Sequence, residues 1–117
     1  IVSAVMELHE KSYMKAENIP LDIIYEDDLI LAVNKSPHMT VHTSAGHQSG
    51  TLAQGVLWHF EKQGLSVKIH PVNRLDRDTS GLTLFAKNAY VQHRLTCQMK
   101  ENGIYKEYLG IVHGCFI

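Results

Sequence analysis

The sequence lacks a long apolar run, is poor in cysteine and carries little net charge. No stretch approaches the roughly 20 apolar residues of a membrane-spanning helix, and the start has no pattern of a secretory signal peptide. The two cysteines, Cys97 and Cys115, belong to no CxxC pair, so neither a disulfide framework nor a zinc ribbon is indicated. We therefore expect a protein of the reducing cytoplasm.

The net charge of −1 argues against a uniformly basic coat for nucleic acid, but the charges are unevenly distributed. Residues 1–66 carry four Lys and eight acidic residues, whereas residues 67–117 carry seven Lys or Arg and four acidic residues. This basic half is consistent with a face that attracts a polyanion and equally with ordinary solvated surface. With 117 residues, 44% of them hydrophobic, the chain is long enough to form one domain, or part of one, with its own core.

Alternating and apolar patterns predict several short strands. Residues 21–26 and 29–35 form strand candidates separated by Asp27-Asp28, and a hairpin is the simplest interpretation. Further short strands are predicted at residues 39–42 and 82–86, and a final strand runs from residue 104 with Tyr105, Leu109 and Ile111 at related positions.

Two helices are predicted between these strands. Thr51 suits the N-cap of a helix that ends at Gly64, and Gly55 within it permits close packing. A second helix begins near Asn88, ends before Gly103 and carries one apolar stripe of Val91, Leu95 and Met99. The fold class is therefore α+β, with a mixed, largely antiparallel sheet flanked by helices. Residues 1–20 are interpreted as a solvated arm or the tail of a preceding segment.

A charged loop precedes the strand predicted at residues 82–86. Arg74, Asp76, Arg77 and Asp78 fall within five residues, and the turn formers Thr79, Ser80 and Gly81 follow. A nearby guanidinium would favour the ionised form of Asp76, and an ionised carboxylate can act as a base or a nucleophile. The alternative is that the two carboxylates only cap a turn and pair with the arginines. Composition alone leaves both interpretations open.

Four segments of the sequence resemble, in order, the motifs of the RluA-type pseudouridine synthases. Residues 73–82, NRLDRDTSGL, followed by Phe85-Ala86-Lys87, are similar to the family's HRLDxxTSGLLLxAK signature. The IYEDD of residues 24–28 with the VNK of residues 33–35 resembles the IYEDxxxxVxNKP segment. The remaining two are GTL at residues 50–52 and KEYL at residues 106–109, which resembles KxYLA.

This resemblance implies an RNA uridine isomerase with a pseudouridine synthase-like fold, no cofactor and no metal. It implies that residues 21–117 are part of a catalytic domain that acts on rRNA or tRNA. Asp76 falls on the signature's aspartate and is implied to be catalytic. Its carboxylate would attack C1′ or C6 or assist proton removal, and the sequence does not distinguish these routes. Tyr108 is implied to line the pocket and stack on the flipped uracil.

The remaining candidate residues have weaker assignments. Arg74 is expected to help open the RNA or grip a phosphate, and a plain salt bridge to Asp76 or Asp78 is an equal alternative. Arg77 and Lys106 are expected to contact phosphates or to be ordinary surface charges. The residues expected to shape the loop are Asn73, Thr79, Ser80 and Gly81.

The sequence departs from the family pattern in several places. Asn73 replaces the usual histidine, although it can still form hydrogen bonds, and Ser36 stands where the family commonly has proline. The family's later THQIR-like segment and the N-terminal S4-type module have no counterpart, so we expect the leading part of a catalytic domain, incomplete at the C-terminus. This departure makes a non-catalytic RNA-binding domain of the same fold the main alternative.

Two other classes of site receive less support from the sequence. His38, His42 and His47 cluster in one region, but their spacing fits no standard zinc pattern. A hydrolase that divides acid and base work between Asp76 and Asp78 is also conceivable. A metal-dependent enzyme would lose activity in EDTA, whereas a pseudouridine synthase should not.

Overall fold

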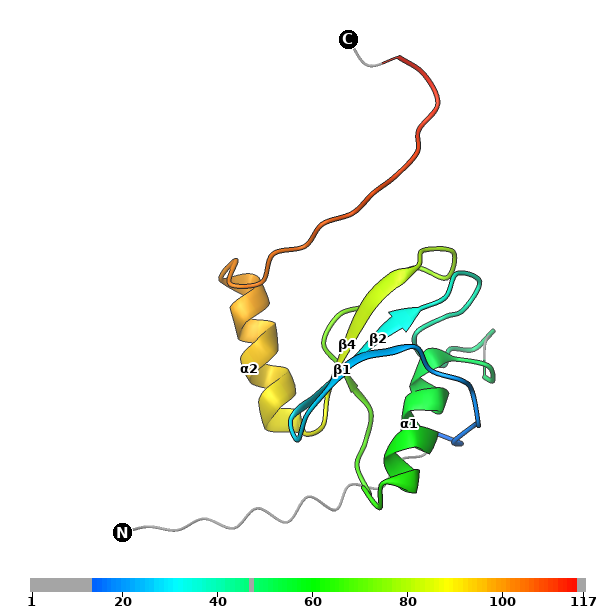
Figure 1. Cartoon of the computed structure of the whole chain (residues 1–117), viewed down its shortest axis with the longest axis vertical. Helices are drawn as coiled ribbons and strands as arrows, with labels where there is room; N and C mark the ends of the chain where they lie inside the picture. Colours follow the sequence, from blue (N-terminus) through cyan, green and yellow to red (C-terminus); the bar gives the residue numbers. More distant parts are fainter. Residues whose placement is uncertain (1–13, 47, 116–117) are drawn as a thin grey trace.

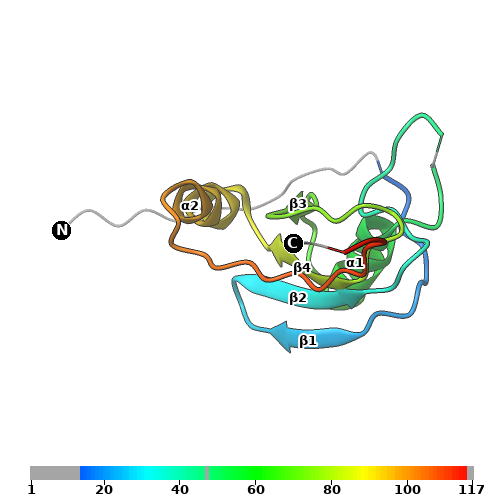
Figure 2. The same ribbon diagram turned by 90° about the horizontal axis from the view of Figure 1, so that it is seen from above.

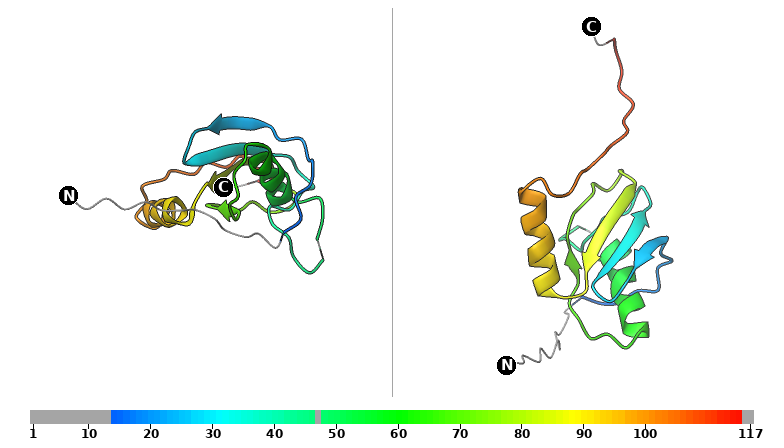
Figure 3. Two further views of the ribbon diagram at one scale, coloured as in Figure 1. Left: turned by 90° about the horizontal axis from the view of Figure 1, so that it is seen from below. Right: turned by 60° about the vertical axis from the view of Figure 1, so that its left-hand side comes forward.

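The computed structural model describes residues 14–46 and 48–115. Its strands form one antiparallel sheet in the order β1-β2-β4-β3 (Figures 1 and 2). The helices lie on different sides of this sheet, with α1 against one face and α2 beside β4 (Figures 1 and 3). This confirms the expected α+β fold with a largely antiparallel sheet. The elements are β1 Ile23–Glu26, β2 Ile30–Lys35, α1 Leu52–Lys62, β3 His70–Pro71, β4 Gly81–Ala86 and α2 Ala89–Lys100.

The predicted hairpin is formed by β1 and β2, and Asp27 shapes its turn. One carboxylate oxygen of Asp27 accepts hydrogen bonds of 2.8 Å from the backbone N–H groups of Leu29 and Ile30. The other accepts a 2.8 Å hydrogen bond from the hydroxyl of Tyr25. These donors hold the pKa of Asp27 below its ordinary value. The turn predicted at Asp27-Asp28 is therefore formed by hydrogen bonds from backbone N–H groups to the Asp27 side chain, as is typical of aspartate in turns.

The core lies between the sheet and α1. Strand alternation directs Leu31 and Val33 of β2 and Phe85 of β4 toward the helix, which contributes Val56 and Phe60. These five side chains are completely buried. The predicted strand at residues 82–86 is therefore confirmed as the central β4, which pairs with both β2 and β3.

The N-terminus of α1 has the predicted cap. Thr51 and Gln54 form a capping box, in which the Gln54 N–H donates to the Thr51 hydroxyl and the Thr51 N–H donates to the Gln54 amide oxygen. The same Gln54 side chain donates a 2.9 Å hydrogen bond to the carboxylate of Glu17. Thr51 and Gln54 are both buried, so this cap ties the chain before β1 to the helix.

Residues 15–21 pack on α1. A Cβ atom on Gly55 would lie 3.1 Å from side-chain atoms of both Ile19 and Leu21, so glycine allows the close packing expected there. The residues before position 21 that the structure describes are thus part of the folded unit. Residues 1–13 of the expected arm lie outside the described residues.

The short strand predicted at residues 39–42 is wrong. Instead, the carbonyl groups of Thr40 and Val41 accept hydrogen bonds of 2.9 Å and 2.8 Å from the N–H groups of Leu52 and Ala53 at the start of α1. Val41 is buried in the core. The apolar pattern therefore reflects packing against the helix terminus and not pairing with a strand.

The final strand predicted from residue 104 is also wrong in this structure. Residues 103–115 leave α2 and extend away from the sheet as an unpaired segment (Figure 1), which overlaps β4 only in the view from above (Figure 2). Leu109 and Ile111 are completely exposed. A strand requires hydrogen bonds from a neighbouring strand, and no strand pairs with this segment within residues 14–46 and 48–115.

Helix α2 begins where predicted but is only loosely attached. The side chain of Asn88 caps it by accepting a 2.8 Å hydrogen bond from the N–H of Val91. The expected stripe of Val91, Leu95 and Met99 is half-buried, and no residue of α2 is fully buried. Gln92 links the helix to β3 by a 2.9 Å hydrogen bond to the carbonyl of Pro71. We find no helix among the described residues long and apolar enough to cross a membrane.

Glu26 is expected to make stability depend on pH. Its burial would raise its pKa, but hydrogen bonds with Lys87, His59 and Gln63, at 2.9, 2.8 and 3.0 Å, outweigh burial and hold the pKa below its ordinary 4.5. A carboxyl group with a depressed folded pKa stabilises the fold above its unfolded pKa, and this stabilisation is lost as pH falls through the folded pKa. The free energy of unfolding should therefore decrease below about pH 4.5.

Urea denaturation at a series of pH values checks this expectation. Glu26→Gln should lower the stability at neutral pH by about 1–3 kcal/mol, because it weakens a half-buried charged network, and should flatten the acid limb. Glu61→Gln is the control, since Glu61 is an exposed residue of α1. An unchanged acid limb in Glu26→Gln would contradict the assignment.

Candidate active site

The loop that carries Asp76 is a tight turn before β4. The Thr79 N–H donates a 3.1 Å hydrogen bond to the Asp76 carbonyl, which closes a turn over residues 76–79. Gly81 follows with φ +133°, a conformation that other residues rarely adopt. Asp76 is exposed. The loop therefore presents this carboxylate to solvent at one end of the sheet.

The buried Lys35 anchors the loop to β2. Its side chain is 1% exposed, and its ammonium group donates hydrogen bonds to the carbonyls of Ser36, Met39 and Arg77 at 2.9, 2.8 and 3.1 Å. The Met39 N–H donates a second bond, of 3.2 Å, to the same Arg77 carbonyl. The carbonyl of the residue directly after Asp76 is thus held by two hydrogen bonds, one from the Lys35 side chain and one from the Met39 backbone, some 40 residues earlier in the chain.

The pKa of the Lys35 ammonium group is held below its ordinary value. Burial lowers the pKa of its ammonium group, and the negative charges of Asp78 and Asp76 oppose that shift. The sequence motifs include Lys35 only as the last residue of the VNK at residues 33–35, with no role assigned to it. The available signal was its position in β2, because strand alternation places it on the same side as Leu31 and Val33, where a charged residue is unusual.

The alternative in which an arginine pairs with Asp76 is not observed among the described residues. Within residues 14–46 and 48–115, Asp76 forms no ion pair, and Arg77 lies 3.9 Å from the carboxylate of Asp78 instead. Asp78 is also 3.0 Å from Nδ1 of His38. Arg74 is exposed. The carboxylate of Asp76 is therefore accessible, and no guanidinium is paired with it in the part of the chain that the structure describes.

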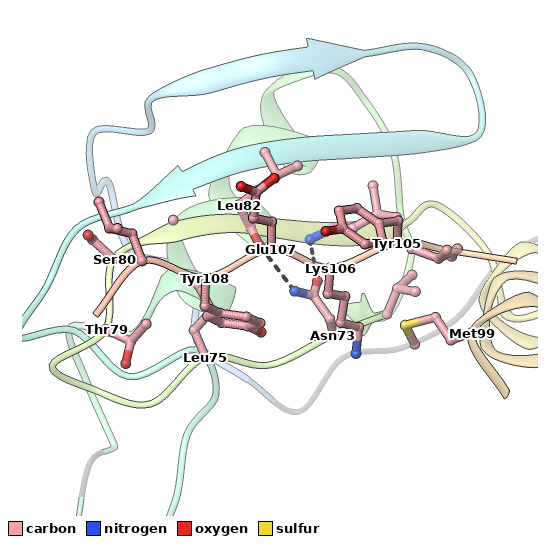
Figure 4. Close-up of a pocket in the computed structure, with 15 residues that line it drawn as sticks. Asn73, Leu75, Thr79, Ser80, Leu82, Met99, Tyr105, Lys106, Glu107 and Tyr108 are labelled. Carbon is pink, nitrogen blue, oxygen red and sulfur yellow. Dashed lines mark hydrogen bonds between the residues drawn. The ribbon is translucent and has the colours of Figure 1, made fainter. Parts of the chain in front are cut away.

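A cavity of about 530 Å³ lies next to the loop, between β4 and the unpaired segment. Thr79 and Ser80 lie at one end, and Met99 of α2 lies at the other (Figure 4). Tyr108 and Lys106 contribute to the wall and are both exposed. The full set of lining residues is Val72, Asn73, Leu75, Thr79, Ser80, Gly81, Leu82, Leu84, Met99 and the six residues 104–109.

The cavity brings together some of the predicted site residues and leaves others out. Asp76, Arg74 and Arg77 do not line it, although Leu75 and Thr79, on either side of Asp76, do. Tyr108 lines it, and its role in binding the uracil stays a prediction. The carboxylate is thus neither sealed in the core nor part of the cavity wall that these residues form.

Asn73 ties the loop to β4. Its amide oxygen accepts a 2.7 Å hydrogen bond from the Leu84 N–H, and its amide nitrogen donates a 3.1 Å bond to the Leu82 carbonyl (Figure 4). These two bonds imitate the pairing of one more strand residue with β4. The hydrogen-bonding capacity expected of this asparagine is therefore used to hold the start of the loop against the sheet.

A family model for RNA pseudouridylate synthase matches residues 29–116. The chain belongs to the RNA pseudouridylate synthase family. This match covers β2, the lysine anchor, the Asp76 loop and the segment with Tyr108. The resemblance stated from the sequence motifs is therefore confirmed.

Two bacterial proteins are among the relatives that this chain matches. The RNA pseudouridine synthase YjbO of Bacillus subtilis is 40% identical over 99 residues, which are 85% of this chain and 35% of that protein. Ribosomal large subunit pseudouridine synthase D of Buchnera aphidicola is 45% identical over 101 residues, which are 86% and 32%. The chain thus spans about a third of the length of these relatives.

A solved structure supports the fold. Human RNA pseudouridylate synthase domain containing 1 superposes with a TM-score of 0.56 at 23% identity, over 70% of this chain and 28% of that one. The histidine-based metal hypothesis gains no support, because no group of three potential ligands occurs in the part of the chain that the structure describes. His47, one of its three residues, lies outside that part.

Proposed function

We propose that the protein containing this chain isomerises uridine to pseudouridine in structured RNA and that Asp76 is its catalytic carboxylate. The observation that carries the proposal is the presentation of Asp76. The family signature's aspartate is exposed on a turn whose next residue is held by a buried lysine. A rigid support of this kind keeps a reacting group in place without covering it. Residues 21–117, with residues 15–20 packed on α1, would form part of the catalytic domain.

The proposed reaction is redox-neutral and needs only groups that proteins contain. The bond between N1 and C1′ breaks, a bond between C5 and C1′ forms, and the proton on C5 is released while N1 gains one. The uracil must be flipped out of its stack for a carboxylate to reach it. Attack on C1′, attack on C6 and assistance to proton removal all remain compatible with an exposed carboxylate. The proposal includes no cofactor and no metal.

The other candidate residues would bind the RNA. Tyr108 would stack on the flipped base, and Arg74, exposed next to the loop, would take the place of the base or bind a phosphate. Arg77 and Lys106 would contact phosphates. Because two matched relatives are named as large ribosomal subunit enzymes, we favour rRNA as the substrate, with tRNA as the alternative.

Release of tritium tests the function. The product of the complete gene is incubated with RNA that carries tritium on C5 of uridine, in the presence and absence of EDTA. We expect release in both conditions, because the mechanism removes the C5 proton and uses no metal. Absence of release from any rRNA or tRNA would refute the proposed activity. Release that EDTA abolishes would favour a metal-dependent enzyme.

A non-catalytic RNA-binding domain is the second candidate, and the cavity favours it. Asp76 does not line the cavity that Tyr108 and its neighbours form, so this surface can hold a base without placing it on the carboxylate. RNA binding of normal affinity without tritium release would support this alternative.

RNA affinity is expected to fall as salt concentration rises, because phosphate contacts displace counterions. Arg77→Gln should reduce the slope of log affinity against log salt by about one, since Arg77 is exposed in the loop. Lys62→Gln is the matched control, because Lys62 lies at the end of α1 and stacks on Trp58. Filter binding at several salt concentrations measures both slopes. A flat response in the unmodified protein would contradict the basic RNA-binding surface.

A further inference from the structure

His38 adopts an unusual backbone conformation directly opposite the Asp76 loop. Its φ is +63°, in the left-handed region that residues other than glycine seldom occupy and that costs free energy. Such a conformation persists where the surroundings hold it in place. Here its ring nitrogen Nδ1 lies 3.0 Å from the carboxylate of Asp78.

The contact between His38 and Asp78 adds little to stability. Their side chains are 75% and 68% exposed, and exposed ion pairs stabilise proteins only weakly. Among the described residues, the charged groups around it are Arg77, 3.9 Å from Asp78, and Lys35, which interacts with both loop carboxylates. His38 is strained, and its contact contributes little to stability. This combination points to a role in fixing the conformation of the loop.

The contact acts on the turn that holds Asp76. The Arg77 carbonyl is fixed from one side by Lys35 and Met39, and the Asp78 side chain is fixed by His38. Together these contacts restrain the two middle residues of the turn, whose first residue is Asp76 and whose last is Thr79. The backbone of the turn that carries Asp76 is therefore restrained by contacts from residues 35–39.

We propose that His38 is a positioning residue that orients the catalytic Asp76 through Asp78. This inference rests on the proposed function, because it assigns His38 a role in that same site. Small displacements of a reacting group lower turnover strongly. His38 does not itself need to touch the substrate, so its loss should lower kcat and leave RNA binding nearly unchanged.

Steady-state tritium release by the complete gene product tests the proposal. His38→Gly removes the ring and relieves the backbone strain, so it should not unfold the protein. We expect kcat about tenfold lower and KM for RNA changed less than about twofold. Asp78→Ala should behave alike, and the double variant should be no worse than either alone.

Two further variants complete the series. His38→Asn should restore most of the turnover, because asparagine tolerates a positive φ and can donate a hydrogen bond to Asp78. His93→Ala, at an exposed histidine of α2, should retain full activity. Additive losses in the double variant, an unchanged kcat in His38→Gly, or a raised KM with unchanged kcat would each overturn the positioning role.

Amide hydrogen exchange gives a readout that is independent of turnover. The Thr79 amide, bonded to the Asp76 carbonyl at 3.1 Å, should exchange faster in His38→Gly if His38 holds the turn. Unchanged exchange would overturn the proposal. A protein that releases no tritium in its unmodified form would refute the proposed function, and the exchange result would still decide whether His38 orders this loop.

Discussion

Asp76→Asn is expected to lower tritium release about a thousandfold, the range typical for loss of a reacting acid or base. Asparagine has nearly the same shape as aspartate but can neither be a carboxylate nucleophile nor accept a proton at neutral pH. Asp76 forms no ion pair among residues 14–46 and 48–115, so its replacement leaves no charged partner unpaired. The loss should therefore be in catalysis and not in folding.

RNA binding and thermal unfolding provide the controls for Asp76→Asn. Affinity should remain within about twofold of the unmodified protein, because phosphate contacts dominate affinity. Asp28→Asn is a matched variant, since Asp28 is exposed at the opposite end of β2, and it should retain full activity. Turnover that survives Asp76→Asn would remove this residue from the mechanism and favour another carboxylate, with Asp78 as the nearest candidate.

Phe60→Ala is expected to lower the free energy of unfolding by about 3–5 kcal/mol. The ring of Phe60 is completely buried between α1 and the sheet, and its removal leaves a cavity in the middle of the core. The variant also loses the contact with the ammonium group of Lys87, which lies 5.7 Å from the ring centroid. Urea denaturation measures the change.

Tyr90→Ala is the matched control for Phe60→Ala. Tyr90 is an aromatic residue on α2 with 62% of its surface exposed, and its replacement should change stability by less than about 0.5 kcal/mol. Equal destabilisation by the two variants would contradict the assignment of a single core under α1. Both proteins should retain the same urea dependence, because the surface exposed on unfolding is nearly the same.

Local signals predicted most of the secondary structure. The β1–β2 turn follows from the Asp27 carboxylate, and the starts of both helices follow from the caps Thr51 and Asn88. In each case the bonding partners lie within three residues of each other, so the sequence contains the whole interaction. The prediction at residues 39–42 failed because the partner of that segment, the first turn of α1, is a tertiary neighbour that a short pattern does not reveal.

The motif resemblance located the Asp76 loop but not its contacts. Neighbouring charges in the sequence suggested a pair between Asp76 and an arginine, yet adjacent side chains of a turn point in different directions. The observed partners of the loop, Lys35 and His38, are about 40 residues earlier in the chain. No turn or strand signal predicts such a contact.

The sequence alone determined the family, the order of most elements and the residue on which the proposed chemistry depends. Sequence motifs, helix caps and strand alternation each depend only on residues that are close together in the chain. The tertiary structure decided how that residue is held. It placed a buried ammonium group under the loop and put a strained histidine across from Asp78. Among the residues that the structure describes, it left residues 103–115 without a strand to pair with. These features depend on which distant segments come into contact when the sheet packs against α1. No local sequence pattern determines the free energy of that packing.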